Sequence, residues 1–400
     1  MVASSSVMSC FHFPFSTITI SQNPSPPLCT LTSPARKVSV RVSSTSSTSS
    51  SISSWTPPRV EPIRFNDSSA TEFSPLICGC YSLAGGHGYI YERDFLDAME
   101  LYARAGFSTF DTADIYGPSE ATCGKFLLNW SKIRAESGNG NTNNNNNSLP
   151  DVKIFTKFVP NLFSNKPTFS FVEQSIQKSM KAIGVPKLDL VQLHWWDYSM
   201  KGMVDVALSM AELREKGLIS SIGTTNMSTE ALAKIIDAGV PVVSNQVQCS
   251  LLDRRPLGSM LDYCKERDIK LFAYGSLTGG VLTNRYLGDR KLVLKTSSLR
   301  MYSRILKEAG GEKYWRKLLT VLLEISTRKS VGIATIALRW VMQQGPIYPI
   351  VGMTSGDHLE ENLKAFCISL DDNDLAQIDQ ILQESSGPRG DCYELERNIF

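Results

Sequence analysis

The 400-residue chain lacks any apolar run long enough to span a bilayer, which takes about 20 residues. It also lacks a strong charge imbalance: the formal net charge is +2, and it is −2 without the four basic residues of positions 1–60. A near-neutral body gives no electrostatic reason to bind nucleic acid or a membrane surface. We therefore expect a small-molecule substrate, no nucleic acid, no membrane, and a monomer or weak oligomer.

Acidic residues are absent from positions 1–60, and the first acid is Glu61. The same stretch is weakly basic and rich in Ser and Thr, which is the composition of an organelle transit peptide. Hydroxyls far outnumber arginines there, which favours the chloroplast stroma over the mitochondrion. An ordinary disordered tail is the alternative. We expect residues 1–60 to be a transit peptide or disordered, and residues 61–400 to form the folded domain.

The nine cysteines form no paired CxxC sets and no Cys/His spacing suited to zinc, so no metal site is predicted. Most of them read as small buried hydrophobes. Cys78 and Cys80 fall on one face of an expected strand, where a redox role is a weak alternative. Cys392 lies near the C-terminus, where we expect it to be exposed, and a reversible thiol switch there is a second weak hypothesis.

From residue 74 onward, short apolar segments alternate with helical ones. The helical segments show apolar residues at three-to-four spacing and commonly end in glycine, as amphipathic helices packed on a sheet do. The expected strands are 75–80, 108–111, 152–157, 188–194, 220–224, 242–246, 270–274 and 347–352.

Nearly continuous apolar strands indicate a parallel sheet that is covered by helices. Eight strands alternating with helices predict an α/β fold, a single-domain (β/α)8 TIM barrel, with an open doubly wound sheet as the alternative. An open dinucleotide-binding sheet should show Gly-x-Gly-x-x-Gly after its first strand. The segment 83–88 lacks that spacing, which disfavours the open sheet.

Two segments interrupt the alternation. Residues 136–149 hold seven asparagines between 139 and 147 and are expected to form a surface loop without chemistry. Residues 281–311 are expected to form a long basic loop after strand seven. That loop could be a solvated face, or a lid over a polyphosphate at the mouth of the barrel.

Titratable residues stand at the ends of three successive strands. Asp111 and Tyr116 follow the second strand, Lys157 ends the third and His194 ends the fourth. Each has an ordinary explanation: a capped turn, a rim salt bridge or a core histidine. The C-terminal ends of barrel strands converge on one face, so the four side chains together predict one catalytic pocket.

This set suits the reduction of a carbonyl group. A free phenol has a pKa of about 10, and a buried ammonium beside it should lower that pKa. Asp111 would keep Lys157 charged, and His194 could donate a hydrogen bond to the carbonyl oxygen. These groups supply a proton but no electrons, so a hydride source is implied, most simply a nicotinamide.

Between residues 74 and 384 the chain resembles the aldo/keto reductases, which are (β/α)8 barrels that use NADPH without a Rossmann domain. The resemblance implies that Tyr116 is the acid/base, with Asp111, Lys157 and His194 as its partners. It rests on the segments 110–117 (FDTADIYG), 155–157 (FTK), 193–194 (LH), 223–226 (GTTN), 245–246 (NQ), 273–280 (AYGSLTGG), 337–341 (ALRWV) and 349–352 (PIVG).

The resemblance also implies a nicotinamide site. Thr225, Asn226 and Gln246 match residues that hold the carboxamide, and Tyr274 matches an aromatic residue that stacks on the ring. Asn and Gln can pair with both sides of an amide, although Asn226 could equally cap a helix and Gln246 be a buried strand polar. The remaining cofactor positions are Ser276, Leu277, Gly352, Thr354, His358, Glu361 and Asn362.

The chain departs from the family pattern at two places. Strand seven usually continues Tyr-Ser-Pro-Leu, whereas residues 274–277 read Tyr-Gly-Ser-Leu. Many members place Lys or Arg after strand eight to bind the 2′-phosphate of NADPH, and residues 352–358 contain neither. The resemblance implies NADPH as the cofactor, and because residues 352–358 lack Lys and Arg, NADH is not excluded.

The sequence thus predicts an NAD(P)H-dependent oxidoreductase that reduces an aldehyde or ketone to an alcohol. One alternative is a catalytically slow regulatory or redox-sensing subunit of the same fold that keeps the nicotinamide residues. Another is a barrel lyase in which Lys157 forms a Schiff base. That reaction needs a depressed lysine pKa, which the nearby Asp111 opposes.

Overall fold

The computed structural model describes residues 58–85, 88–138, 149–161, 168–288, 290–385 and 387–397. The expected transit peptide lies almost entirely outside the described residues, as does the asparagine-rich stretch 139–148.

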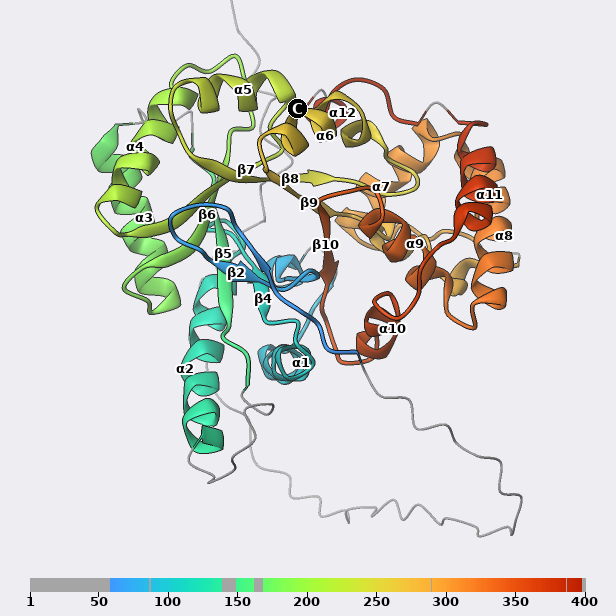
Figure 1. Cartoon of the computed structure of the whole chain (residues 1–400), viewed down its shortest axis with the longest axis horizontal. Helices are drawn as coiled ribbons and strands as arrows, with labels where there is room; N and C mark the ends of the chain where they lie inside the picture. Colours follow the sequence, from blue (N-terminus) through green and yellow to red (C-terminus); the bar gives the residue numbers. More distant parts are fainter. Residues whose placement is uncertain are drawn as a thin grey trace, which may run out of the picture. The chain divides into compact units, whose positions relative to one another are not determined.

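Eight parallel strands close into a barrel in the order β10-β3-β4-β5-β6-β7-β8-β9 (Figure 1). The predicted (β/α)8 barrel is therefore confirmed, and the open-sheet alternative is wrong. The strands are β3 (Ile77–Gly79), β4 (Thr109–Asp111), β5 (Lys153–Phe158), β6 (Leu188–His194), β7 (Ile219–Thr225), β8 (Val242–Gln248), β9 (Lys270–Tyr274) and β10 (Ile347–Gly352).

Helices surround the strands (Figure 1). Their ends follow from local chemistry: in α3 the Thr168 hydroxyl accepts from the backbone N–H of Phe171, and Gly184 ends the helix in the left-handed region. The helices are α1 (Glu92–Arg104), α2 (Ser119–Gly138), α3 (Phe169–Ile183), α4 (Met203–Glu215), α5 (Thr229–Asp237), α6 (Ser259–Glu266), α7 (Ser297–Glu308), α8 (Gly311–Arg328), α9 (Ile333–Met342), α10 (Leu359–Lys364), α11 (Asp372–Leu382) and α12 (Glu394–Arg397), with 3-10 turns η1 (Tyr81–Ala84), η2 (Arg255–Leu257), η3 (Thr278–Gly280) and η4 (Asn284–Tyr286).

Both segments expected to be loops contain helix. Residues 136–138 form the last turn of α2, so the expected loop starts too early. The basic segment 281–311 contains η4 and α7, and α7 buries Tyr302, Ile305 and Leu306. The basic side chains of the segment are exposed. In the sequence the many charges indicated a loop, although the buried residues of α7 have the three-to-four spacing of an amphipathic helix.

A short hairpin that the sequence analysis did not predict closes the interior of the barrel. Strands β1 (Ile63–Arg64) and β2 (Glu72–Phe73) pair antiparallel. Phe65 and Phe73 have ring centroids 4.8 Å apart, and Phe73 lies 5.4 Å from Phe272 of β9. These rings are buried together with Phe155 of β5. Two-residue strands carry no period-2 signal, which explains why the hairpin was missed.

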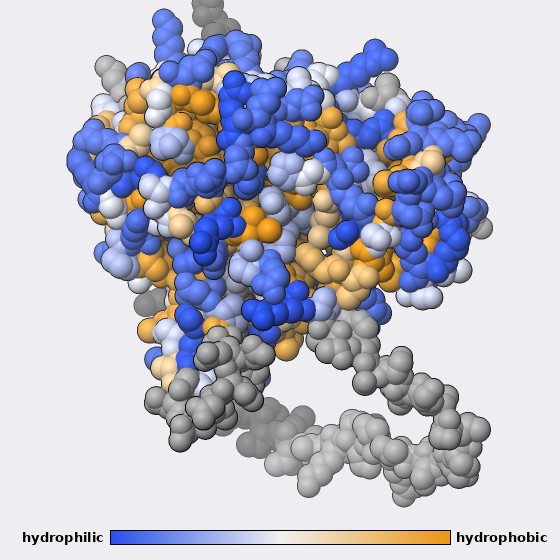
Figure 2. Space-filling view, viewed as in Figure 1, coloured by the Kyte–Doolittle hydropathy of each residue, from blue (hydrophilic) through white to orange (hydrophobic). Residues whose placement is uncertain are grey.

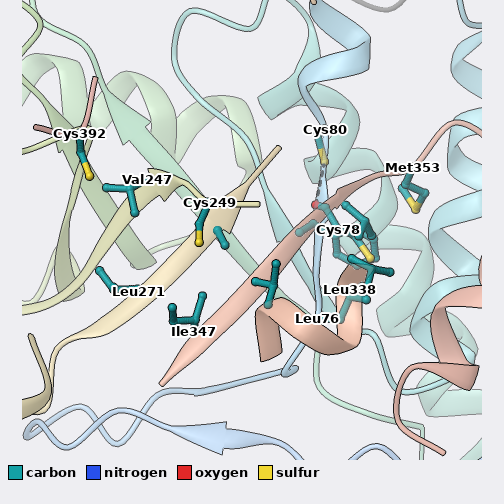
Figure 3. Close-up of a cluster of buried hydrophobic side chains, with 14 of the residues drawn as sticks. Leu76, Cys78, Cys80, Val247, Cys249, Leu271, Leu338, Ile347, Met353 and Cys392 are labelled. Carbon is teal, nitrogen blue, oxygen red and sulfur yellow. Dashed lines mark hydrogen bonds between the residues drawn. The ribbon is translucent and has the colours of Figure 1, made fainter. Parts of the chain in front are cut away.

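The cysteines are part of the hydrophobic packing. Cys78, Cys80 and Cys249 are buried among aliphatic side chains between strands and helices (Figure 3). The expectation for Cys392 is wrong: it is only 2% exposed, and its Sγ lies 3.6 Å from the sulfur of Met260. Burial raises the pKa of its thiol well above the usual range, which disfavours the reactive thiolate.

The surface shown in Figure 2 is mainly hydrophilic, with hydrophobic residues exposed between the polar ones. None of the helices in the described part of the chain is long and apolar enough to cross a membrane. Within the same ranges, no cluster of three or more His, Cys, Asp or Glu residues is arranged to hold a metal ion.

We expect Phe73→Ala to lower the free energy of unfolding by about 3–5 kcal/mol, because it empties a ring-sized space inside the barrel. Urea denaturation followed by circular dichroism measures the change. Tyr89→Ala is the matched control, since Tyr89 is 85% exposed. Equal stability of the two variants would show that the hairpin does not support the barrel.

Candidate active site

The predicted catalytic side chains lie at the C-terminal ends of neighbouring strands. Asp111 ends β4, Lys157 is near the end of β5 and His194 ends β6. They are 4%, 3% and 7% exposed, respectively. Charged residues are rarely buried this deeply unless they are paired.

A buried ion pair is the centre of the site. The Lys157 Nζ donates to Asp111 Oδ2 at 2.5 Å and to the carbonyl oxygen of Thr112 at 2.9 Å. The same Nζ lies 5.0 Å from the centroid of the Tyr116 ring. The structure thus brings Asp111, Lys157 and Tyr116 together, as the sequence predicts.

The net shift of the Tyr116 pKa is upward, whereas the sequence analysis expected Lys157 to lower it. Burial raises the pKa of Tyr116 well above its ordinary value, and the negative charge of Asp111 raises it further. The Lys157 ammonium is bonded to Asp111, so its field at the phenol is largely compensated. Tyr116 therefore holds its proton at neutral pH, which is the form that donates.

The second carboxylate oxygen of Asp111 is bound by two amides. Asp111 Oδ1 accepts from Gln192 Nε2 and from Gln246 Nε2, both at 2.8 Å. Gln246, expected to face a nicotinamide, thus also contacts the catalytic carboxylate. The sequence analysis missed Gln192, although a strand residue two positions before His194 shares its face.

The residues expected to hold a nicotinamide amide meet at the ends of β7 and β9. Asn226 has a positive φ of 55°, and its Oδ1 accepts a 2.9 Å hydrogen bond from the Tyr274 hydroxyl. Thr225 Oγ1 is buried, and none of the residues that the structure describes forms a hydrogen bond with it. A buried hydroxyl without a partner costs free energy. These residues therefore fit a ligand that carries an amide.

The two other expected cofactor positions on this side of the barrel differ in what they offer. Ser276 is buried, and its hydroxyl donates to the carbonyl oxygen of Ala273, whereas Leu277 is partly exposed. The unusual Gly275 has a φ of +68°, and a Cβ there would lie 2.7 Å from the Tyr302 hydroxyl. The glycine thus makes room for α7 to pack beside the pocket.

The positions expected to bind the adenosine end lie around β10 and α10. Gly352, Thr354 and His358 are exposed, and Glu361 is partly exposed. Asn362 is buried, and its amide donates to the Tyr102 hydroxyl at 3.1 Å. Near them, Ser355 donates to the carboxylate of Asp357. An acidic group here does not favour a 2′-phosphate, in agreement with the missing Lys or Arg.

A tyrosine that follows the first barrel strand also adjoins the catalytic phenol. The Tyr81 ring packs edge-on against Tyr116, with centroids 5.0 Å apart. The Tyr81 hydroxyl is hydrogen-bonded to Ser297, the first residue of α7. The sequence analysis did not single out Tyr81, although it stands just after a strand end.

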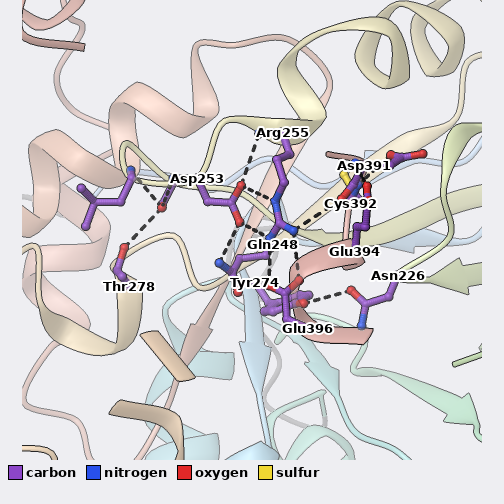
Figure 4. A network of polar contacts seen from close by, with 12 residues as sticks. Asn226, Gln248, Asp253, Arg255, Tyr274, Thr278, Asp391, Cys392, Glu394 and Glu396 are labelled. Carbon is purple, nitrogen blue, oxygen red and sulfur yellow. Dashed lines mark hydrogen bonds and ion pairs between the residues drawn. The ribbon is translucent and has the colours of Figure 1, made fainter. Parts of the chain in front are cut away.

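The C-terminal segment 391–397 also lies against the site (Figure 4). The Tyr393 ring stands edge-on to His194, with centroids 5.6 Å apart. Arg255 binds both oxygens of Glu396, at 3.0 and 2.8 Å, and also pairs with Asp253. The side chains of this triad are at most 5% exposed. The spacing of residues in the sequence does not indicate that Arg255 holds the C-terminal segment through Glu396.

One further carboxylate beside the site should make stability depend on pH. Burial raises the pKa of Asp114 to about 7, against about 3.9 for an unfolded chain. Between these values the folded state binds more protons, so stability should fall as the pH rises from about 4 to about 7. Asp114→Asn should flatten that slope in urea denaturation, whereas Asp97→Asn, at an exposed position, should not. An unchanged slope in Asp114→Asn would contradict this assignment.

Comparisons with known proteins agree with the fold. The chain is 28% identical over 329 residues to the chloroplastic pyridoxal reductase of Arabidopsis thaliana, covering 78% of this chain and 84% of the relative. A glycerol dehydrogenase from Gluconobacter oxydans has a similar fold, with a TM-score of 0.67 at 20% identity, covering 82% of this chain and 97% of that one.

A second solved structure, an aldo-keto reductase complexed with NADPH, has a TM-score of 0.61 at 20% identity and covers 83% of this chain and 89% of its own. The model of the aldo/keto reductase family matches residues 75–383, which is most of the chain. The chain therefore belongs to the aldo/keto reductase family.

Proposed function

We propose that the protein is an NADPH-dependent reductase that converts an aldehyde or ketone to an alcohol. The observation that carries the proposal is the position of Tyr116 beside a buried ion pair. Lys157 Nζ is bonded to Asp111 and lies 5.0 Å from the centroid of the Tyr116 ring. The protonated phenol of Tyr116 can protonate an oxygen as negative charge develops on it. Family membership supports the same reaction class.

The residues divide the work as follows. Tyr116 donates the proton to the carbonyl oxygen. Asp111 keeps Lys157 charged and oriented. The Lys157 ammonium, 5.0 Å from the centroid of the Tyr116 ring, then offsets part of the destabilisation that burial and the Asp111 charge impose on the phenolate that is left. His194, at the end of the next strand, orients the carbonyl oxygen by a hydrogen bond.

A bound nicotinamide supplies the hydride, and the ends of β7, β8 and β9 are suited to hold it. Thr225, Asn226 and Gln246 offer hydroxyl and amide groups to its carboxamide, and Tyr274 offers a ring face. Ser276 and Leu277 follow on the same side, while Gly352, Thr354, His358, Glu361 and Asn362 would line the adenosine end. The cofactor of a structural relative is NADPH, which supports that choice. Because Asp357 disfavours a 2′-phosphate, NADH is the alternative cofactor.

We also propose import into the chloroplast stroma. The acid-free, hydroxyl-rich composition of residues 1–60 supports it, and the named Arabidopsis relative is chloroplastic. Localisation of a fusion that carries these residues ahead of a fluorescent protein tests the proposal, with a fusion of residues 61–400 as the control.

Tyr116→Phe should lower the kcat for carbonyl reduction by at least about a hundredfold, because it removes the proton donor. The KM for NADPH should change little. The measurement is NADPH oxidation against a panel of aldehydes and ketones, with NADH in parallel. Tyr89→Phe, an exposed phenol, is the matched control.

Full activity of Tyr116→Phe would contradict the mechanism. NADPH binding by wild type without any carbonyl-dependent oxidation would instead indicate the slow regulatory subunit. Borohydride trapping of a substrate on Lys157 would indicate the Schiff-base lyase.

The pH dependence should differ between the two directions of the reaction. The raised pKa of Tyr116 keeps the phenol protonated, so reduction should show no alkaline decline below about pH 10. Alcohol oxidation needs the deprotonated form and should become faster as the pH rises. Rates of both directions measured between pH 6 and 10 test this. A decline of the reduction rate near pH 7 that is absent in Tyr116→Phe would contradict it.

A further inference from the structure

Gln192 is a polar residue in an interior that barrels usually fill with branched apolar side chains. It lies on β6, two positions before His194, and its side chain is fully buried. Burying an amide is costly unless its groups are hydrogen-bonded. Gln192 meets that condition: its Nε2 donates to Asp111 Oδ1 at 2.8 Å, and its Oε1 accepts from Gln246 Nε2 at 2.9 Å.

This arrangement fixes which way the Gln246 amide faces. Both donors of the Gln246 NH2 group are engaged, one by Asp111 Oδ1 and one by Gln192 Oε1. With its nitrogen turned toward Asp111, the amide presents its oxygen away from the carboxylate. That oxygen is the acceptor that a carboxamide NH2 of a nicotinamide would require.

The neighbouring strand leaves room for this side chain. Gln192 pairs in register with Gly223 of β7. A Cβ at Gly223 would lie 3.0 Å from Gln192 Cγ and 2.5 Å from Ser244 Oγ. The first contact is tight and the second would force Ser244 to move, so a larger residue at position 223 would crowd the Gln192 side chain. The space that Gln192 occupies is therefore set by the backbone around it.

We propose that Gln192 is a positioning residue that links Asp111, the partner of Lys157, to Gln246, which would bind the carboxamide of the cofactor. Through its two hydrogen bonds it holds Asp111, and so Lys157, in register with Gln246. Cofactor affinity and proton transfer then depend on the same side chain. This inference rests on the proposed function.

The test is Gln192→Leu, which has a similar size and removes both hydrogen bonds. The dissociation constant for NADPH, measured by quenching of protein fluorescence, should rise about tenfold, the effect of one lost hydrogen bond of ordinary strength. The kcat for carbonyl reduction should fall about tenfold as well. Gln192→Asn, which keeps an amide but shortens its reach, should lie between Leu and wild type.

Gln343→Leu is the matched control. Gln343 is also tied by its amide, to Arg339 and to the backbone of Leu370, but it lies on the helical shell rather than inside the barrel. We expect it to lose stability while its NADPH affinity and kcat stay within twofold of wild type. A purely structural role of Gln192 would give the same pattern and would overturn the proposal.

Gln192→Glu gives an independent readout if the leucine variant does not fold. The charged groups that face this position are Asp111 on β4 and Lys157 on β5, whereas β7 and β8 present Gly223 and Gln246. A second carboxyl beside Asp111 should be protonated at low pH and able to donate to it. The kcat should therefore fall as the pH rises from about 5 to 8 in this variant and not in wild type.

A pH profile of Gln192→Glu identical to that of wild type would overturn the proposal. The failure of the proposed function would look different. If wild type neither bound NADPH nor reduced any carbonyl, the function would be wrong. If Tyr116→Phe were inactive while Gln192→Leu and Gln192→Glu matched wild type, only the role of Gln192 would be wrong.

Discussion

The ion pair between Lys157 and Asp111 is the interaction on which the site depends. Two opposite charges inside a barrel are tolerated only when their hydrogen-bonding capacity is met, because desolvation of each ion is expensive. Here the carboxylate is bound on one oxygen by the lysine and on the other by two glutamine amides, and the lysine also binds a backbone carbonyl. Removing either ion would leave an unpaired buried charge. The ion pair and the two amides that bind it also link strands β4, β5, β6 and β8.

The parts of this architecture that the sequence predicted are those with a local signature. Short apolar segments that end in a polar residue marked the strand ends, and parallel strands bring such ends to one face. Asp111, Tyr116, Lys157 and His194 could be assigned to one mouth for that reason. Helix ends with glycine, such as Gly184, were equally readable.

What the sequence did not reveal depends on contacts between distant residues. The raised pKa of Tyr116 follows from its burial and from the negative charge of Asp111, and neither effect can be inferred from the spacing of residues in the sequence. Cys392 is buried because the segment that carries it packs against Met260 of α6, a contact between residues far apart in the sequence. The β1–β2 hairpin and the amphipathic α7 were hidden by short length and by exposed charge. Gln192 could have been found, because the two-residue period of a strand places it on the same face of β6 as His194.

The fastening of segment 391–397 by Arg255 has a practical consequence for handling the protein. A purification tag or fusion partner carried on this segment would leave the barrel beside His194, where it could strain the Arg255–Glu396 contact. The β1–β2 hairpin instead lies among the rings that close the interior of the barrel, away from the groups that react. Material for kinetic work is therefore better produced with its tag ahead of residue 58 and with residues 391–397 left unmodified.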